Sequence, residues 1–187
     1  MIRTMLIFSD SHNESRYMKK ALEMNSNADM IVHLGDGAAD LSKIFPADYE
    51  KPLILIEGNG EYYGWVGVDR RYRPKKSDMV EFEGKKIFMT HGHLYDVKYG
   101  IERIAARAYC DGADIVLFGH THIPLIKYIP EGTELEYVGK TSRPLLLFNP
   151  GSISKGTTHS FGLLTFNGSD VLPSLGKIGK IGEIGEK

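Results

Sequence analysis

Histidines, acidic residues and one asparagine form five short clusters along the chain, and each cluster directly follows an apolar run typical of a β-strand. Imidazole nitrogens together with carboxylate and amide oxygens suit divalent Mn, Fe, Zn, Ni or Co. The clusters hold more of these groups than one ion needs. They therefore predict two ions, and paired ions serve hydrolysis at phosphorus. In chain order the clusters are Asp10-Ser11-His12, Gly35-Asp36, Gly58-Asn59, His91-Gly92-His93 and Gly119-His120-Thr121-His122.

Each cluster taken alone has an ordinary interpretation. A single histidine is usually an interior or surface residue, and a single aspartate can cap a helix. Such residues at five successive strand ends favour one shared site, because the carboxyl ends of strands are where α/β sheets bind ligands.

Three residues near the clusters are not predicted ligands. His33 lies inside an apolar run, and we expect a hydrogen-bonded core histidine there. His93 follows His91 by two residues and is a candidate for contact with the substrate or for a place around the ligands. Asp40 follows Asp36 by four residues and is left out of the site, because a solvent-facing position in the next helix explains it equally well.

Short apolar runs predict the strands that position the clusters, and the first lie in strand, helix, strand order. Helical spacing of apolar residues predicts helices over 14–24, with Asn13 as N-cap, and over 99–109. Gly84 predicts a hairpin, and residues 125–129, 135–138 and 145–148 predict an antiparallel ribbon. This order indicates an α/β domain with mixed sheets. The predicted buried strands cover 4–8, 30–34, 52–57, 86–90, 115–118, 145–148 and 161–166.

In this order the five clusters resemble the motifs of the calcineurin-like metallophosphoesterases. The short chain of 187 residues and the segment Asn149-Pro150-Gly151-Ser152 bring the resemblance closest to the small bacterial and archaeal phosphodiesterases of the YfcE type. The resemblance covers about residues 1–166. It implies a four-layer α/β/β/α sandwich with two mixed β-sheets and a dimetal centre along the strand ends.

The family pattern also implies a role for each cluster. Asp36 would bridge two ions, and a hydroxide between them would be the nucleophile. Manganese is the expected ion, with Ni, Fe, Zn and Co as alternatives. Asp36, Asn59 and His91 are also the candidate catalytic residues. The implied ligands are Asp10, His12 and His122 for one ion and Asn59, His91 and His120 for the other.

The pair Gly60-Glu61 departs from the family pattern. Larger relatives follow the metal-binding asparagine with a histidine that can protonate the leaving oxygen, and the small phosphodiesterases commonly carry Cys-Asp. Because Gly60 has no side chain, the general acid stays unassigned.

Composition limits the remaining possibilities. The formal net charge of −1 gives no global positive field for nucleic acid. Cys110 is the single cysteine, which excludes an intramolecular disulfide. We found neither a signal peptide nor an apolar stretch long enough to span a membrane, so we predict a cytoplasmic protein. One domain over 1–175 and a tail over 176–187 rich in Gly, Lys, Ile and Glu are expected.

Three functions fit these observations. The leading prediction is a dimetal phosphodiesterase that acts on a small phosphodiester, with a homo-oligomer left open. A non-catalytic metal-bound scaffold of the retromer-subunit type is one alternative, and the intact ligand set argues against it. A nuclease is the other. It would need an extended basic surface, and only residues 70–76 qualify, which we interpret first as a solvated loop rather than a substrate clamp.

Overall fold

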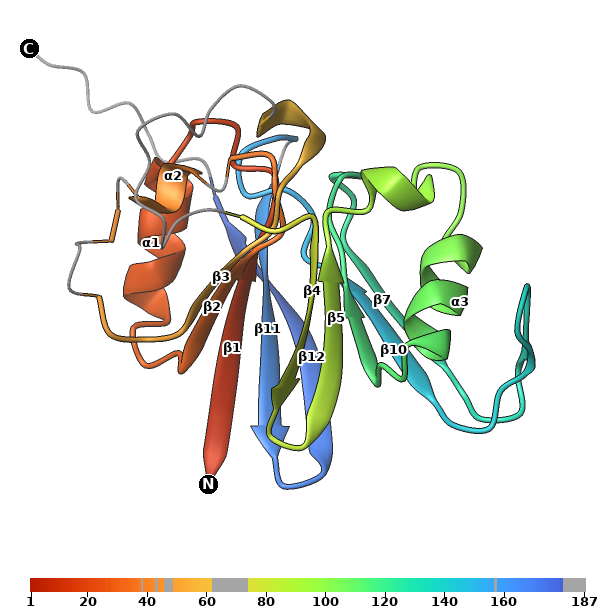
Figure 1. Cartoon of the computed structure of the whole chain (residues 1–187). Helices are drawn as coiled ribbons and strands as arrows, with labels where there is room; N and C mark the ends of the chain where they lie inside the picture. The colour runs from red at the N-terminus through yellow and green to blue at the C-terminus, as the bar shows by residue number, and fades with distance from the viewer. Residues whose placement is uncertain (38, 43, 46–48, 62–73, 157, 180–187) are drawn as a thin grey trace, which may run out of the picture.

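Two five-stranded sheets face each other in the computed structural model (Figure 1). Each sheet contains both parallel and antiparallel pairs, so the predicted mixed sheets are confirmed. The structure describes residues 1–37, 39–42, 44–45, 49–61, 74–156 and 158–179.

The first sheet has the order β12-β11-β1-β2-β3. Its strands β1, β2 and β3 are parallel, and the antiparallel β11 and β12 extend it on the other side. Helix α1 (Arg16–Met24) makes the crossover between β1 and β2. The strand bounds are β1 (Ile2–Phe8), β2 (Met30–His33), β3 (Leu53–Leu55), β11 (His159–Asn167) and β12 (Asp170–Ile178).

The second sheet has the order β4-β5-β6-β10-β7. Strands β5, β6 and β10 are parallel, whereas β4 and β7 are antiparallel edge strands. The hairpin predicted at Gly84 is confirmed, because it joins β4 to β5. The strand bounds are β4 (Ser77–Phe82), β5 (Lys85–Thr90), β6 (Ile115–Leu117), β7 (Leu125–Ile129) and β10 (Leu145–Asn149).

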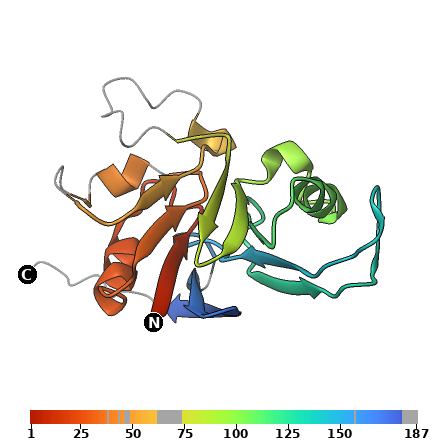
Figure 2. The same cartoon turned by 60° about the horizontal axis from the view of Figure 1, so that its bottom comes forward.

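Helices cover the outer faces of both sheets. Helices α1 and α2 (Ala39–Ser42) lie outside the first sheet, and α3 (Glu102–Cys110) lies outside the second (Figure 2). One apolar cluster fills the space between the sheets, where Met5 and Ile7 of β1 share a core with Phe148 of β10. Two further clusters lie beneath the helices. The predicted four-layer α/β/β/α sandwich is therefore confirmed.

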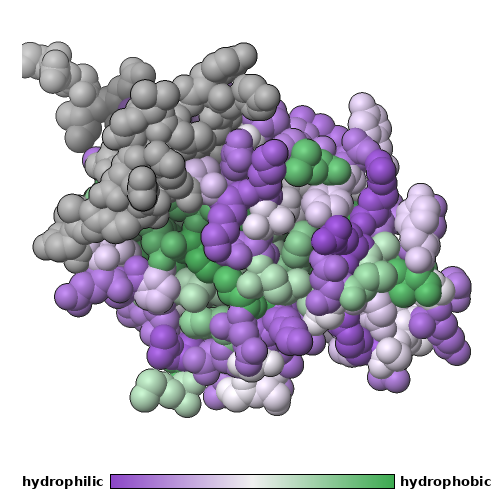
Figure 3. All heavy atoms as spheres, in the orientation of Figure 1, coloured by the Kyte–Doolittle hydropathy of each residue, from purple (hydrophilic) through white to green (hydrophobic). Residues whose placement is uncertain are grey.

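The sheets also meet along one pair of edges. Backbone bonds join the end of β3 to the segment before β4, from Lys75 N–H to Leu55 O at 3.0 Å and from Glu57 N–H to Lys75 O at 2.8 Å. Figure 3 shows a largely polar face here, with apolar side chains gathered in its middle. Across the described ranges, no helix has the length and apolar character that crossing a membrane requires.

Several local predictions differ from the structure. The predicted strand over 135–138 is wrong, because β8 (Glu134–Leu135) turns back on β9 (Gly139–Lys140) in a separate small ribbon. Asn13 does not cap α1. The N-cap is Ser15, and Asn13 lies in the preceding loop with φ of 68°.

Strand β12 was not predicted, and it runs through Ile178. Three residues of the expected tail 176–187 thus lie in the first sheet, and residues 180–187 lie outside the described ranges. The division into a domain over 1–175 and a tail stays a prediction.

Candidate metal centre

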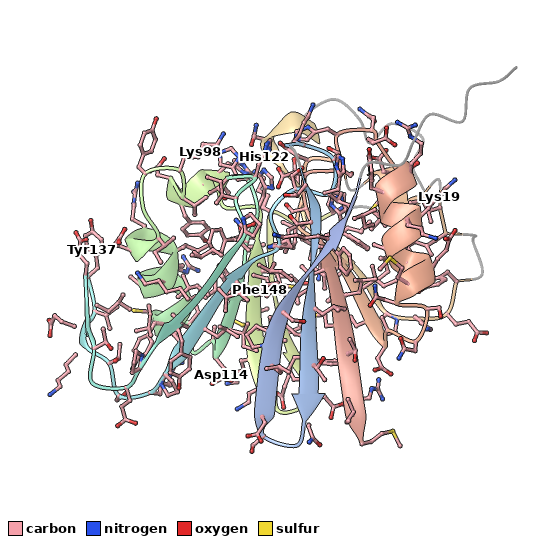
Figure 4. The ribbon with its side chains drawn as sticks, turned by 180° about the vertical axis from the view of Figure 1, so that it is seen from behind. Lys19, Lys98, Asp114, His122, Tyr137 and Phe148 are labelled. Atoms are coloured by element: carbon pink, nitrogen blue, oxygen red, sulfur yellow. The ribbon has the colours of Figure 1, made fainter. Side chains whose placement is uncertain are left out.

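The parallel strands of both sheets end at one edge of the sandwich (Figure 1), and six of the predicted ligands form two groups there. His122 lies at this edge, and Asp114 lies at the opposite end of the sheet (Figure 4). The loops are linked within each sheet by backbone bonds from Asp10 N–H to Gly35 O at 2.9 Å and from Gly119 N–H to His91 O at 3.0 Å. The sequence therefore predicted that these residues lie at the carboxyl ends of the parallel strands.

The ligand loops have an unusual backbone. In the described ranges nine residues other than glycine have positive φ, and five of them are predicted ligands. Left-handed conformations cost about 1 to 3 kcal/mol each and persist only where neighbouring groups hold them, although Asp and His tolerate them better than most residues. The five residues are Asp10 (56°), His12 (46°), Asp36 (55°), His120 (68°) and His122 (59°).

The first ligand group consists of Asp10, His12 and His122. Asp10 Oδ1 lies 3.2 Å from His122 Nε2 and 3.9 Å from His12 Nε2. The two imidazole nitrogens lie 3.3 Å apart. These three atoms converge closely enough to surround one cation.

The Asp10 carboxylate provides a test of whether this group fits a metal. Its Oδ2 accepts hydrogen bonds from Ser9 Oγ at 2.6 Å and from His120 N–H at 3.1 Å. Its Oδ1 is buried and has no hydrogen-bond partner among the described residues. A buried carboxylate oxygen without a hydrogen bond is costly unless a cation compensates it, so the group fits a divalent ion.

The second ligand group consists of Asp36, His91 and His120. His91 Nε2 lies 3.6 Å from Asp36 Oδ2 and 3.2 Å from His120 Nδ1. The other His91 nitrogen, Nδ1, lies 2.7 Å from Leu34 O and donates its hydrogen to that carbonyl. This bond leaves the Nε2 lone pair free for a metal, as in many metal-binding histidines.

Most resolved pKa shifts in the centre favour the protonation states that bind metal, whereas for His91 burial lowers the pKa but Asp36 and Asp10 outweigh it and raise that pKa. Burial raises the pKa of Asp36, but His91 and the Gly60 N–H outweigh it and hold that pKa well below its usual range. Burial acts the same way on Asp10, and His122, His91 and Ser9 lower its pKa overall. Burial lowers the pKa of His120 to about 4. Ionised carboxylates and neutral imidazoles are the forms that bind divalent ions.

Asn59, the seventh predicted ligand, belongs to neither group of histidines and acids. It begins the 3-10 turn η1 (Asn59–Glu61) after β3 and is exposed. The next residue contacts the second group, because Gly60 N–H donates to Asp36 Oδ1 at 2.6 Å. Asn59 therefore stands beside Asp36, and its role as a ligand stays a prediction.

His93 lies at the margin of the second group. It begins the 3-10 turn η3 (His93–Tyr95), and its ring centre is 5.4 Å from that of His91 and 6.1 Å from that of His120. Its Nδ1 is buried without a hydrogen-bond partner in the described ranges. Contact between His93 and a substrate stays a prediction.

His33 is the core histidine that the sequence predicted. It is fully buried and contacts Ser11 Oγ through Nε2 at 3.1 Å and Gly35 N–H through Nδ1 at 3.2 Å. Asp40, left out of the site on sequence grounds, is also fully buried below the first ligand loop. The helical position of Asp40 gave no sign of which way its side chain points.

The basic segment 70–76 is described only in part. Residues 70–73 lie outside the described ranges, and Lys75 and Lys76 are exposed. A role of this segment in substrate binding stays untested.

Two facing mixed sheets with paired histidine and aspartate groups at their strand ends define a metal-dependent phosphoesterase architecture. Residues 4–169 match the family model of the calcineurin-like phosphoesterase superfamily domain, and the chain belongs to this family. The resemblance noted from the five clusters is thereby confirmed.

Relatives include small phosphoesterases of the predicted type. The probable metallophosphoesterase YsnB of Bacillus subtilis is 31% identical over 164 residues, which are 86% of this chain and 82% of YsnB. The phosphodiesterase YfcE of Escherichia coli is 32% identical over 88 residues, which are 46% of this chain and 37% of YfcE. The solved structure of YfcE matches with a TM-score of 0.54 at 22% identity and covers 86% of this chain and 87% of YfcE.

The fold also occurs in a trafficking protein. Vacuolar Protein Sorting 29 of Cryptosporidium parvum matches with a TM-score of 0.67 at 14% identity and covers 96% of this chain and 99% of that chain. At this identity the likeness shows a shared fold alone.

Proposed function

We propose that the protein is a dimetal-dependent phosphodiesterase that hydrolyses a small phosphodiester. The observation that supports this most is the contact between the two ligand groups. His91 Nε2 lies 3.6 Å from Asp36 Oδ2 in its own group and 3.9 Å from Asp10 Oδ1 in the other. Ligand groups in contact would hold two divalent ions near each other, and such a pair would supply catalysis of displacement at phosphorus.

The described residues have the donor types that two divalent ions require. Bound there, the ions would lower the pKa of a water molecule and stabilise charge on the phosphoryl group. Asp36 is proposed to serve both ions, and manganese is the proposed ion, with Ni, Fe, Zn and Co as alternatives, since all accept nitrogen and oxygen ligands. Asp10, His12 and His122 would hold one ion, and Asn59, His91 and His120 the other.

The chain's own groups orient these donors. The Leu34 carbonyl sets which His91 nitrogen carries hydrogen, and the Gly60 N–H fixes one oxygen of Asp36. We propose Asp36, Asn59 and His91 as the residues beside the reacting phosphate. We propose that His93, at the margin of the second group, contacts the substrate.

The expected substrate preference rests on Gly60, which leaves no proton donor at this position beside the second group. Gly60 follows Asn59 and offers no side chain that could protonate a leaving oxygen. General acid catalysis contributes about 10² to 10⁴ in rate, so substrates with acidic leaving groups should be preferred. A diester also places less negative charge among the carboxylates than a monoester does.

Two alternatives remain distinguishable from this proposal. A scaffold of the retromer-subunit type shares the fold, but it would not require a buried Asp10 Oδ1 that lacks a hydrogen bond among the described residues, or the tautomer that Leu34 imposes on His91. A nuclease would need an extended basic surface next to the centre.

A substrate panel tests the proposal and both alternatives. Metal-free protein should be assayed on cyclic nucleotides, a bis-aryl phosphodiester, aryl and alkyl monoesters and single-stranded DNA, each with Mn, Ni, Mg or Zn. We expect the highest kcat/KM on a small diester with Mn. Faster cleavage of DNA would favour the nuclease, and no turnover of any ester with two bound ions would favour the scaffold.

A further inference from the structure

Two of the left-handed histidines, His12 and His120, share a second feature. In each loop a single buried side chain binds residues on both sides of the histidine. These side chains, Asp40 and Asn149, are fully buried and bind the residues next to the histidine in each loop. We call them the Asp40 clamp and the Asn149 clamp.

The Asp40 clamp holds the loop that carries His12. One carboxylate oxygen, Oδ2, accepts hydrogen bonds from Ser11 Oγ at 2.7 Å and from Asn13 N–H at 2.9 Å. Ser11 precedes His12 and Asn13 follows it. Both neighbours of the histidine are therefore fixed to the same atom, which lies in α2 rather than in the loop itself.

His33 extends this clamp to the loop of Asp36. Burial lowers the pKa of His33 to about 4, so the imidazole is neutral and carries one hydrogen. Gly35 N–H donates to Nδ1 at 3.2 Å, which places that hydrogen on Nε2, and Nε2 lies 3.1 Å from Ser11 Oγ. His33 therefore donates to Ser11, and the single hydroxyl hydrogen of Ser11 is shared between Asp40 Oδ2 at 2.7 Å and the Gly37 carbonyl oxygen at 3.0 Å.

The Asn149 clamp holds the loop that carries His120 and His122. Its amide nitrogen Nδ2 donates to Gly119 O at 3.0 Å and lies 3.1 Å from Thr121 Oγ1. Its oxygen Oδ1 accepts a hydrogen bond from Gly151 N–H at 2.8 Å, so both the nitrogen and the oxygen of the amide form hydrogen bonds. The Asn149-Pro150-Gly151-Ser152 segment, noted in the sequence only for its resemblance, thus contacts the metal loops.

The same segment also holds the loop of Asp10. The hydroxyls of Ser152 and Ser154 both donate to the Asp10 carbonyl oxygen, at 2.8 and 2.9 Å. The turn after β10 consequently contacts the backbone of both loops that supply the first ligand group.

We propose that Asp40 and Asn149 are positioning residues that hold His12 and His120 in their left-handed conformation, so that both ligand groups are formed before metal binds. The inference rests on the ligand roles in the proposed function. Without the clamps, the loops would relax to ordinary backbone conformations, and metal binding would have to restore the strained ones.

The two clamps hold different ligands. Asp40 acts on His12, which belongs to the first ligand group alone. Asn149 acts on His120 of the second group and, through Thr121, on His122 of the first. Because Asp40 reaches the loop of Asp36 only through Ser11 and His33, its loss should weaken mainly the ion of the first group, whereas loss of Asn149 should weaken both.

Calorimetric titration of metal-free protein with Mn separates these effects. We expect wild type to bind two ions, Asp40→Ala to bind one of them about 10- to 100-fold more weakly, and Asn149→Ala to bind both more weakly by that factor, the usual effect of losing an outer partner of a ligand. Asp40→Asn keeps an acceptor oxygen and should recover much of the loss.

Asp29→Ala is the matched control. Asp29 Oδ2 also accepts a backbone hydrogen bond, from Thr4 N–H at 2.7 Å, but at the end of β1 away from the centre. This variant should lower the melting temperature of metal-free protein and leave both Mn dissociation constants unchanged. If Asp40→Ala and Asn149→Ala behaved in the same way, their role would be structural only and the inference would be overturned.

Milder variants serve if the alanine variants do not fold. Ser11→Ala removes one hydrogen bond of Asp40, together with the Ser11 contacts to His33 and Gly37, and Thr121→Val removes one contact of Asn149, together with the Thr121 bonds to the Ile123 backbone. Smaller losses of the same pattern are expected, and unchanged Mn binding in both would overturn the inference. If wild type bound fewer than two ions, the proposed function would fail as well, whereas two ions bound equally by all variants would overturn this inference alone.

Discussion

The two ligand groups have similar chemistry and different surroundings. In the second group the side chain of His91 is 0% exposed and that of Asp36 is 7% exposed. In the first group the side chains of His12 and His122 are 28% and 36% exposed. Water therefore reaches the first group more easily, and its ion should exchange faster.

This difference follows from the architecture. Asp36 comes from the first sheet and His91 from the second, and they meet where the sheets face each other. His12 and His122 lie further out on their loops, at the rim of the sandwich. Burial makes Asp36 and His91 harder to replace by water than His12 and His122, so equal substitutions at these positions should have unequal effects.

The largest effect is expected from Asp36→Ala. Asp36 is proposed to serve both ions. Its loss should therefore weaken metal binding in both ligand groups. We expect kcat/KM to fall more than about 1,000-fold, beyond the 10- to 100-fold cost of losing an outer partner. Metal analysis should show fewer than two Mn per chain.

Asp111→Ala is a suitable control for this variant, because Asp111 is an exposed acid paired with Arg107 at 2.7 Å. It should keep wild-type rate and metal content. A wild-type rate and two bound Mn in Asp36→Ala would contradict the bridging role.

Leaving-group dependence should be the next largest effect. Because Gly60 offers no proton donor beside the second group, we expect a bis-aryl phosphodiester to be cleaved about 100-fold or more faster than an alkyl monoester, within the range of general acid catalysis. The measurement is the ratio of kcat/KM under saturating Mn.

Equal efficiency on both esters would mean that another side chain supplies the proton, and a loss confined to the alkyl ester in His93→Ala would identify it. Adding a donor by Gly60→His is a less direct test. A Cβ at Gly60 would lie 3.1 Å from Asp36 Oδ1, so the carboxylate must shift to admit the new side chain.

The difference in exposure between His91 and His122 predicts different losses of metal binding when each is replaced. His91→Ala should weaken Mn binding about tenfold more than His122→Ala, because water can take the exposed position of His122 but not the buried one of His91. Calorimetric titration with Mn measures both. Equal losses would show that burial does not distinguish the two groups.

Two truncations should have the smallest effect on the centre. Deletion from Gly176 removes Ile178, which is 7% exposed and pairs with His159 at the edge of the first sheet. We expect a melting temperature a few degrees lower, with kcat unchanged once the protein is folded. Deletion from residue 180 should change neither. A fall in kcat in the shorter deletion would show that the tail contributes to the site.

Much of this fold could be predicted because the central strands are buried on both faces. Their apolar runs are continuous, as in residues 5–8 of β1 and in β10. Strand β12 has a mixed burial pattern and contains Pro173 and Gly176, which an edge strand tolerates but which weaken the sequence signal. The wrong strand over 135–138 arose because residues 136–138 form the turn between β8 and β9, with Tyr137 at φ of 67°.

The positions of most candidate ligands could also be predicted from the sequence. Strand ends located the ligand clusters, and the structure places six of the seven predicted ligands in two groups. The side chains that hold the loops could not be predicted in this way. Asp40 and Asn149 act through contacts with loops that are distant in sequence, and periodicity does not reveal such contacts.

The most direct test of the account is the dependence of turnover on manganese. Chelated, metal-free protein should show no hydrolysis of a bis-aryl phosphodiester, and added Mn should restore full activity when two ions are bound per chain. Full activity without metal, or full activity with a single Mn per chain, would contradict the dimetal centre.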